Sequence, residues 1–194
     1  AKKYEVQREE QRMANGCMPV DISITTRELA RMIQRAGILF DHLPEGQFDP
    51  MLGLSTGASV IFGASGGVME AALRTVVEVV TGGEMKPLEF HEVRGMEGIK
   101  EAVYELPGRT VRVCAASGLH NAKTVLDGVK NGTLHYDFIE FMACPGGCVG
   151  GGGQPIHDGQ ELAFDRGRQL YRLDRDCKVR FSHENPDIRK LYDE

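Results

Sequence analysis

The stretch from residue 110 to residue 144 carries a strand pattern, a helix pattern and a second strand pattern, in that order. TVRVCAASG (residues 110–118) is rich in β-branched and small apolar residues, which indicates a buried strand. NAKTVLDGVKNG has the spacing of an amphipathic helix and ends at Asn131-Gly132. YDFIEFMAC (residues 136–144) is a second strand. Because a helix that joins two strands usually places them parallel in one sheet, this stretch predicts an α/β fold.

The same alternation extends along the rest of the chain. Residues 20–25 and 88–95 also have strand patterns, which brings the predicted strands to four. The predicted helices cover residues 4–13, 25–37, 66–83, 96–108 and 158–177, and a last one begins at Asn185-Pro186. We therefore predict a mostly parallel four-stranded sheet with helices on both faces.

Three strand ends carry polar, small or sulfur-containing residues. Thr25-Thr26, Ser117-Gly118 and residues 142–148 each follow a predicted strand. Thr25 and Glu28 also have the spacing of a capping box, which predicts where the next helix begins. Because parallel strands end at the same edge of a sheet, these three stretches are expected to share the edge where such folds bind ligands.

Composition limits the classes of partner. Lys and Arg total 23 and Asp and Glu total 28, so the formal net charge is −5, and no basic cluster suggests nucleic-acid binding. No apolar run approaches the roughly 20 residues of a membrane helix, and the charged start AKKYEVQREEQR does not resemble a signal peptide. Five cysteines are an odd number, so a disulfide framework is not expected. We expect a cytoplasmic protein whose partners are neither nucleic acid nor membrane.

MACPGGCVGGGGQP (residues 142–155) places two cysteines beside the most glycine-rich part of the chain. Thiolates at Cys144 and Cys148 can bind one metal centre together, and the glycines let backbone amides approach its sulfurs closely. Zinc sites and cubane clusters normally take four ligands, however, and Cys17, Cys114 and Cys177 show no matching spacing. Two packed cysteines in a tight turn therefore remain an alternative. A phosphate-binding loop is disfavoured, because no Gly-Lys-Ser/Thr ending is present.

A second glycine-rich stretch, FGASGGVMEAALR (residues 62–74), is a loop that leads into a helix. Helix N-termini attract anions, so this loop is either a ligand site or simply a glycine-rich helix start. Met142 is interpreted in the same two ways, as a ligand contact or as core filling. Lys2 and Lys3, taken alone, are typical solvated lysines.

Several motifs together resemble those of one family, the iron-only hydrogenases. EFMACPGGCVGGGGQP resembles the third signature of that family, and STGASVIFGASGGVMEAALRT resembles the stretch between the second and third signatures. AKKYE resembles the end of the second signature, and DISITTRELARMI and SHENPDIRKLYDE also match. The resemblance covers essentially the whole chain. The cysteine motif is specific when it is combined with GGVMEAALR, and either motif alone is weaker evidence.

The resemblance implies a cofactor and ligands for it. In this family the active site is the H-cluster, a 4Fe-4S cubane joined through a cysteine sulfur to a two-iron subcluster that carries CO and cyanide. Cys144 is expected to ligate the cubane, and Cys148 is expected to ligate the cubane and bridge to the two-iron subcluster. The reaction would be the reversible reduction of protons to H2.

Further residues acquire roles only through the same resemblance. Lys2 is expected to donate a hydrogen bond to a cyanide ligand. Met142 and Phe62 are expected to pack around the two-iron subcluster. The loop that contains Gly63, Ser65 and Gly66 is expected to lie close beside it.

The family pattern is incomplete in these 194 residues. Two of the four cubane cysteines belong to the first signature and to the residues just before AKKYE, and neither is present. Residues 1–194 are therefore expected to form the carboxyl portion of the catalytic domain, truncated at the N-terminus and unable to evolve H2 alone. The N-terminal half or another subunit would complete it, and a ferredoxin-type or NAD(P)-linked carrier would exchange electrons with it. Two alternatives are an iron–sulfur assembly factor without hydrogen chemistry and an inactive, metal-free fragment.

Overall fold

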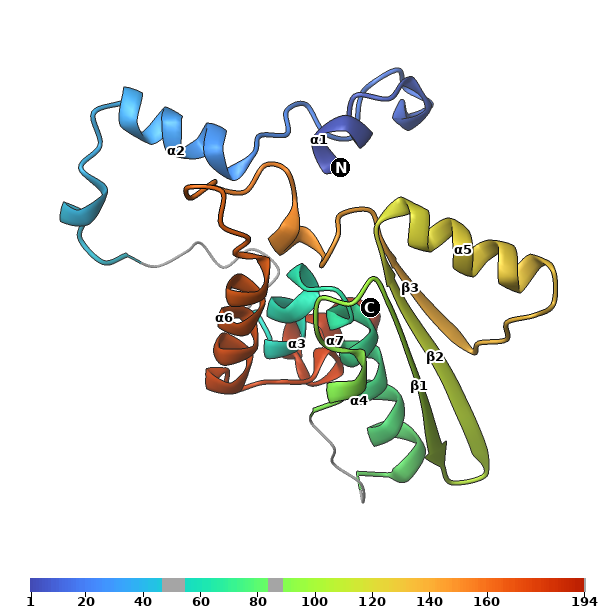
Figure 1. Ribbon diagram of the computed structural model, residues 1–194. Coiled ribbons are helices and arrows are strands. Elements are labelled where there is room, and N and C mark those ends of the chain that lie inside the picture. Colours follow the sequence, from blue (N-terminus) through green and yellow to red (C-terminus); the bar gives the residue numbers. More distant parts are fainter. Residues whose placement is uncertain (47–54, 84–88, 194) are drawn as a thin grey trace. The chain divides into compact units, whose positions relative to one another are not determined.

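The computed structural model describes residues 1–46, 55–83 and 89–193 (Figure 1). The chain divides into two units, each of which is described by itself. Unit 1 comprises residues 1–49 and 151–160, and unit 2 comprises residues 50–150 and 161–194. The sheet and the apolar core both belong to unit 2.

Within the described residues, unit 2 contains a three-stranded mixed sheet of order β1-β2-β3. The strands are β1 (Ile99–Leu106), β2 (Arg109–Ser117) and β3 (Phe138–Met142). β1 and β2 are antiparallel neighbours joined at Pro107-Gly108, whereas β2 and β3 are parallel. The strand–helix–strand unit at residues 110–144 is confirmed. The mostly parallel four-stranded sheet is not confirmed. In the described part of the chain the sheet has three strands, and β2 is antiparallel to β1 and parallel to β3.

Helices cover both faces of this sheet, as predicted (Figure 1). α4 (Gly67–Thr81) packs on one face, where Met69, Leu73 and Val77 meet Val111 and Val113 of β2 in the larger apolar cluster. α5 (Leu119–Lys130) packs on the other face. There Val125 contacts Cys114 and Ala116, the residues of β2 that alternate with those facing α4. The continuous burial of residues 113–117 in β2 follows from this double cover.

Besides the helix predicted at residues 4–13, three predicted elements are wrong. Residues 96–108 do not form a helix, because most of them form β1 and the hairpin turn after it. Residues 20–25 carry no strand, and in the 88–95 stretch the described residues contain a short 3-10 helix, His91–Val93, instead. Residue 88 lies outside the described residues. Residues 20–25 alternate between apolar and polar side chains as a strand does, but the described part of unit 1 contains no strand with which they could pair.

The remaining helices of unit 2 follow the predictions more closely. α6 (Ala163–Asp176) begins five residues later than expected, and α7 (Pro186–Asp193) starts at the predicted Asn185-Pro186, where Asn185 Oδ1 accepts from the N–H of Asp187 at 3.0 Å. A short helix, α3 (Gly57–Val60), precedes α4. The described 3-10 turns of the whole chain are Glu9–Gln11, Phe40–His42, Ile61–Gly63, His91–Val93, Cys148–Gly150 and Ser182–Glu184.

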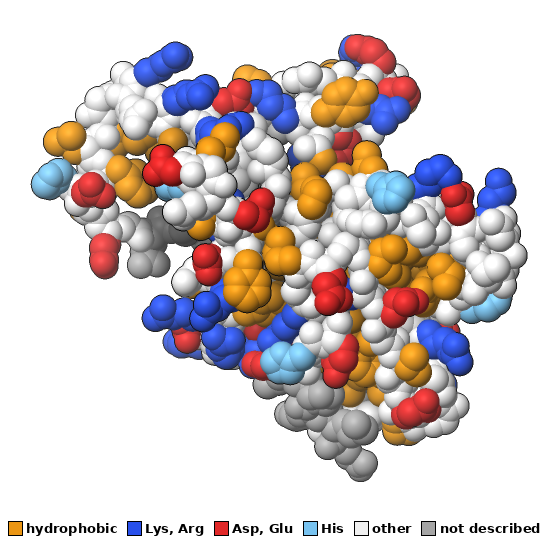
Figure 2. All heavy atoms as spheres, viewed as in Figure 1, with side chains coloured by type: hydrophobic (Ala, Val, Ile, Leu, Met, Phe, Trp, Pro, Cys, Tyr) orange, Lys and Arg blue, Asp and Glu red, His pale blue; other side chains and the backbone are white. Residues whose placement is uncertain are grey.

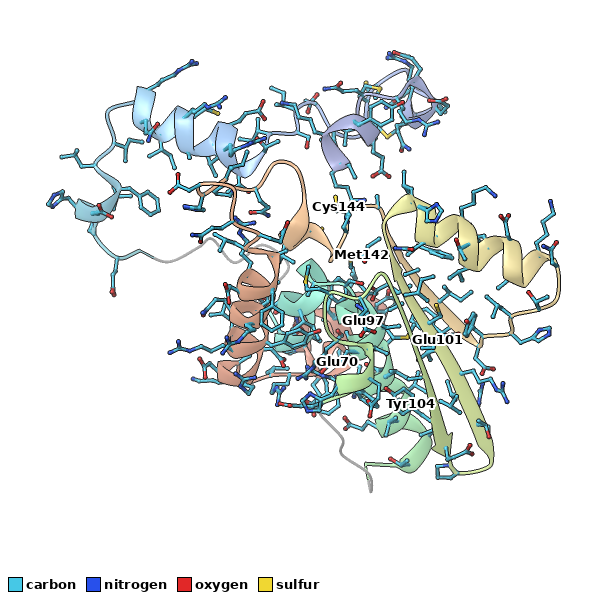
Figure 3. All side chains as sticks on the ribbon, viewed as in Figure 1. Glu70, Glu97, Glu101, Tyr104, Met142 and Cys144 are labelled. Atoms are coloured by element: carbon cyan, nitrogen blue, oxygen red, sulfur yellow. The ribbon has the colours of Figure 1, made fainter. Side chains whose placement is uncertain are left out.

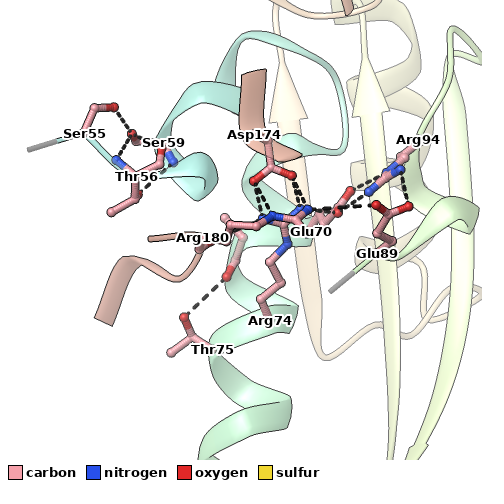
Figure 4. A network of polar contacts seen from close by, with 11 residues as sticks. Ser55, Thr56, Ser59, Glu70, Arg74, Thr75, Glu89, Arg94, Asp174 and Arg180 are labelled. Atoms are coloured by element: carbon pink, nitrogen blue, oxygen red, sulfur yellow. Dashed lines mark hydrogen bonds and ion pairs between the residues drawn. The ribbon is translucent and has the colours of Figure 1, made fainter. Parts of the chain in front are cut away.

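A buried chain of alternating charges joins α4 to α6 (Figure 4). Arg74 donates from both terminal nitrogens to the two oxygens of Asp174, each at 2.8 Å, and also to Glu70 at 2.7 Å. Arg94 and Arg180 continue the series at its two ends, on Glu70 and Asp174 respectively. Arg74, Glu70 and Asp174 are almost fully buried, so each charge depends on its neighbours for compensation.

Unit 1 is built from shorter elements. α1 (Lys2–Glu5) and the following 3-10 turn replace the longer helix predicted at residues 4–13. α2 (Thr26–Arg35) has the predicted capping box, in which Thr25 and Glu28 accept from each other's backbone N–H groups. Apolar side chains lie at the surface over α2 and the turn after it (Figure 2), including Met32, Leu39 and Phe40. Of the helices in the described ranges, none has the length and apolar character needed to span a membrane.

Candidate metal centre

The cysteine segment, defined as residues 142–150, leaves the sheet at the end of β3. Met142 is the last residue of β3 and pairs with Ser117, the last residue of β2. The N–H of Gly118 donates to the carbonyl of Met142 at 2.8 Å, and the N–H of Gly146 donates to Ser117 Oγ at 3.1 Å. The ends of two parallel strands therefore hold the segment, and Met142 and Cys144 lie at that end of the sheet (Figure 3).

The expected grouping at this edge is confirmed in part. Ser117-Gly118 and the cysteine segment meet there, as the preceding contacts show. Thr25-Thr26 does not follow a strand, since Thr25 caps α2 in unit 1.

The cysteine segment packs directly on the glycine loop, defined as residues 63–67. The N–H of Ser65 donates to the carbonyl of Gly146 at 2.9 Å. Gly147 has a φ of +97° and lies so close that a Cβ atom there would stand 2.6 Å from the nitrogen of Ser65. Both the positive φ and the close approach require glycine. The two glycine-rich stretches singled out in the sequence are thus in contact.

The N–H groups at the start of α4 donate to a carboxylate of the chain itself. Glu140, from β3, accepts from the N–H of Gly66 at 2.6 Å and from the N–H of Met69 at 2.8 Å. These N–H groups have no acceptor within the helix, and the helix dipole favours a negative charge beside them. The glycine loop is therefore capped by a carboxylate of the chain itself rather than left open for an external anion.

Lys100 holds the same loop from β1. Its ammonium group donates to Ser65 Oγ at 2.9 Å, to the carbonyl of Ser65 at 3.0 Å and to the carbonyl of Gly95 at 3.0 Å. Burial lowers the pKa of Lys100 below its ordinary value, while the charge of Glu140 favours the ammonium form. Three acceptors match the three donors of the ammonium group, so this buried cation is fully hydrogen-bonded.

The other predicted site residues have diverse surroundings. Cys144 and Met142 are half-buried and Cys148 is exposed. Phe62, in the 3-10 turn Ile61–Gly63, is 44% exposed. Lys2 belongs to unit 1, where its ammonium donates to Glu5 Oε2 at 3.0 Å.

The donor chemistry of the cysteine segment fits part of an iron–sulfur site. No disulfide joins any of the five cysteines. Within the described residues, no group of three or more His, Cys, Asp or Glu side chains is arranged to hold a metal ion. Two thiols on a glycine-rich backbone match the soft ligands and close amides that a cubane cluster uses, and two is half of the four ligands that such a cluster takes.

Sequence reasoning missed the buried charges around the site. Glu140 and Lys100 received no role, nor did the series that runs through Arg74. A signal was present in two cases: Glu140 is the single charge in the apolar strand FIEFM, and Arg74 lies in the mostly apolar helix VMEAALRTVVEVV with Glu70 four residues before it. Charged residues in such positions are rarely buried without partners.

Comparison with known proteins shows the family. Residues 1–152 match the model of the iron-only hydrogenase large subunit, C-terminal domain, and residues 160–194 match the model of the iron hydrogenase small subunit. The chain therefore belongs to the iron-only hydrogenase family. Within the structure, the part that matches the small subunit contributes α6 and α7.

Individual relatives agree with this assignment. The chain is 50% identical over 195 residues to the NADP-reducing hydrogenase subunit HndD of Solidesulfovibrio fructosivorans, covering 100% of the chain and 33% of that protein. It is 51% identical over 166 residues to the periplasmic Fe hydrogenase large subunit of Nitratidesulfovibrio vulgaris, covering 86% of the chain and 39% of that protein. The chain thus spans well under half the length of these relatives.

A solved structure and a more distant relative complete the comparison. An FeFe-hydrogenase structure from Chlamydomonas reinhardtii matches with a TM-score of 0.73 and 39% identity, over 99% of this chain and 56% of that one. The cytosolic iron-sulfur assembly component 3 of Bos taurus is 28% identical over 181 residues, which are 90% of this chain and 37% of that protein.

Proposed function

We propose that this chain is the carboxyl portion of the catalytic domain of an iron-only hydrogenase, which catalyses the reversible reduction of protons to H2. The observation that carries the proposal is the packing of the cysteine segment on the glycine loop. Cys144 and Cys148 are presented by a backbone held at both strand ends and against residues 63–67. Such a fixed pair of thiols beside glycine amides suits a large inorganic cluster.

In this proposal the H-cluster, once bound, supplies the redox chemistry, and the chain supplies its surroundings. Cys144 and Cys148 would hold the 4Fe-4S cubane as thiolates, and Cys148 would also link it to the two-iron subcluster. Phe62 and Met142 would exclude water from that subcluster. The backbone of Gly63, Ser65 and Gly66 would lie beside it, and Lys2 would donate a hydrogen bond to one of its cyanide ligands.

The remaining ligands and the electron carrier lie outside this chain in the proposal. The N-terminal half of the catalytic domain, or another subunit, provides the other two cubane cysteines. A ferredoxin-type or NAD(P)-linked carrier exchanges the electrons, and the protein works in the cytoplasm.

A second candidate function is iron–sulfur assembly without hydrogen chemistry. It is favoured by one observation, the match to an iron-sulfur assembly component over 90% of the chain. The identity of 28% is well below the 50% found for the hydrogenase subunit, so we place hydrogen chemistry first.

The two functions are separated by a chimera. This chain replaces its aligned 195-residue region in the hydrogenase subunit of S. fructosivorans, and the chimera is matured anaerobically with the hydrogenase maturation proteins. We expect H2 production from reduced methyl viologen and infrared bands of CO and cyanide. Cys144→Ser and Cys148→Ser should abolish both, whereas Cys177→Ser, which alters a half-buried cysteine outside the motif, should retain both.

Other results of the same experiment would support the assembly role or a metal-free protein. Iron and sulfide without CO or cyanide bands would support an assembly role. A chimera that folds but holds neither iron nor sulfide would contradict both metal-dependent functions and leave a metal-free protein.

A further inference from the structure

Two buried charges of opposite sign hold the glycine loop from the side of the sheet. Lys100 is 3% exposed and Glu140 is 5% exposed, and they come from the two outer strands, β1 and β3. Lys100 binds Ser65, and Glu140 binds the N–H groups of Gly66 and Met69. Charged side chains are costly to bury, so their position directly under this loop calls for an explanation beyond packing.

The contacts form a continuous path from these charges to the cysteine segment. Lys100 fixes both the side chain and the carbonyl of Ser65, and the N–H of Ser65 in turn donates to the carbonyl of Gly146. Gly147 packs against that same nitrogen. Gly146 and Gly147 are two of the three residues between Cys144 and Cys148, so the placement of both thiols depends on where Ser65 lies.

We infer that Lys100 and Glu140 are positioning residues for the thiol pair and that their charges tune the electrostatic potential at the metal centre. This inference rests on the proposed function, because it assigns these charges to the cluster that Cys144 and Cys148 would bind. Neither side chain touches that cluster. Lys100 sets the position of the glycine loop, Glu140 sets the start of α4, and the cysteine segment follows both.

Hydrogen exchange of the metal-free chain tests the positioning. In Lys100→Met the amide of Ser65 should exchange about tenfold faster, because a buried charged hydrogen-bond donor is lost. In Glu140→Gln the amides of Gly66 and Met69 should accelerate by a similar factor. In both variants the amides of α5 should exchange at their wild-type rates. The control Lys123→Met removes a lysine whose side chain is 74% exposed and should leave the exchange of residues 65, 66 and 69 unchanged.

Two milder variants keep this test decisive if Lys100→Met fails to fold. Ser65→Ala removes one of the three acceptors of Lys100 and should accelerate exchange of the Ser65-position amide by only a few-fold, since two charge-assisted bonds remain. Lys100→Arg keeps the charge and should restore slow exchange relative to Lys100→Met. Unchanged exchange at residues 65, 66 and 69 in the folded variants would overturn the positioning role.

The cluster potential in the hydrogenase chimera tests the electrostatic part. Removing the positive charge in Lys100→Met should make the cubane harder to reduce, and removing the negative charge in Glu140→Gln should make it easier to reduce. The two shifts should therefore have opposite signs. General loosening would move both potentials in one direction, and that result, or no shift in either, would overturn the inference.

The outcomes for the two proposals are distinguishable. If the wild-type chimera binds no cluster, the proposed function fails, while the exchange experiment still decides whether Lys100 and Glu140 position the cysteine segment. If the cluster forms with CO and cyanide but both variants behave like Lys123→Met, the proposed function stands and this inference fails.

Discussion

The two units of the chain are stabilised in different ways. Unit 2 has a sheet, two apolar clusters and a buried series of charges. In unit 1, none of the described residues is buried. Hydrogen bonds and ion pairs hold its parts, such as the capping box of α2, the pair between Lys3 and Glu28 and the bond from Arg27 to the carbonyl of Gly152 at 2.6 Å. The same type of side chain should therefore contribute very differently in the two units.

The largest effect is expected at the buried charges of unit 2. Asp174→Ala leaves Arg74 buried with only Glu70 to compensate it and should lower the free energy of unfolding by about 3–5 kcal/mol. Urea denaturation followed by circular dichroism measures this. Asp176→Ala, on the same helix but exposed, should change stability by less than about 0.5 kcal/mol. Equal effects of the two substitutions would show that the buried series does not stabilise the fold.

Methionines offer the most direct contrast between the units. Met69→Ala empties a fully buried position in unit 2 and should cost about 2–5 kcal/mol, as other large-to-small core substitutions do. Met32→Ala acts on a side chain that is 55% exposed in unit 1 and should cost less than about 0.5 kcal/mol. Thermal and urea unfolding compare them. A large cost at Met32 would mean that unit 1 buries this side chain in solution.

Glycines of the same run should also differ. Gly147→Ala places a Cβ against Ser65 at a positive φ and should cost about 1–3 kcal/mol of strain. Gly152→Ala meets nothing within 4 Å and should be close to neutral. Unfolding curves of the two variants and alkylation rates of Cys144 and Cys148 would show the difference. If Gly147→Ala is as well tolerated as Gly152→Ala, the cysteine segment does not need its close approach to the glycine loop.

The smallest effect is expected from the pH dependence of unit 1. The Lys3 ammonium and the Thr25 backbone N–H lower the pKa of Glu28 to about 2. Because a carboxylic acid outside this environment titrates near 4.3, the contribution of Glu28 to the cap of α2 is fully present above that pH and is lost as pH falls through about 2. NMR titration of the carboxyl carbon measures the pKa directly, and Lys3→Ala should return it toward 4.3. An unshifted carboxyl in the unmodified chain would contradict the pair.

The elements that sequence reasoning predicted well are those with local signals. α4 lies between two glycines with positive φ, Gly66 and Gly82, and α2 begins at a capping box, so their bounds follow from neighbouring residues. β1 was misread as a helix for a physical reason. Its inward positions begin with the buried Lys100, and Val103 points outward, so the alternation of apolar and polar residues is disrupted. Pro107-Gly108, interpreted as a helix stop, is the hairpin turn.

The candidate site was predicted unevenly for a similar reason. The paired cysteines and both glycine stretches are short motifs that can be recognised in the sequence. The structure places residues 63–67 against residues 142–150. The supporting charges could not be found that way. Lys100 and Glu140 act through contacts 35 and 74 residues away in sequence, and no short window contains both partners.

Because Glu140 is the acceptor for the first turn of α4, this contact can form only late in translation. The N–H groups of Gly66 and Met69 leave the ribosome more than 70 residues before Glu140 does. Until then the helix start has only water as its acceptor, and Gly146, the partner of Ser65, is still unmade. Cys144 and Cys148 are therefore translated after the glycine loop, Lys100 and Glu140, so a nascent chain cannot present their thiols in the final arrangement before β3 has joined the sheet.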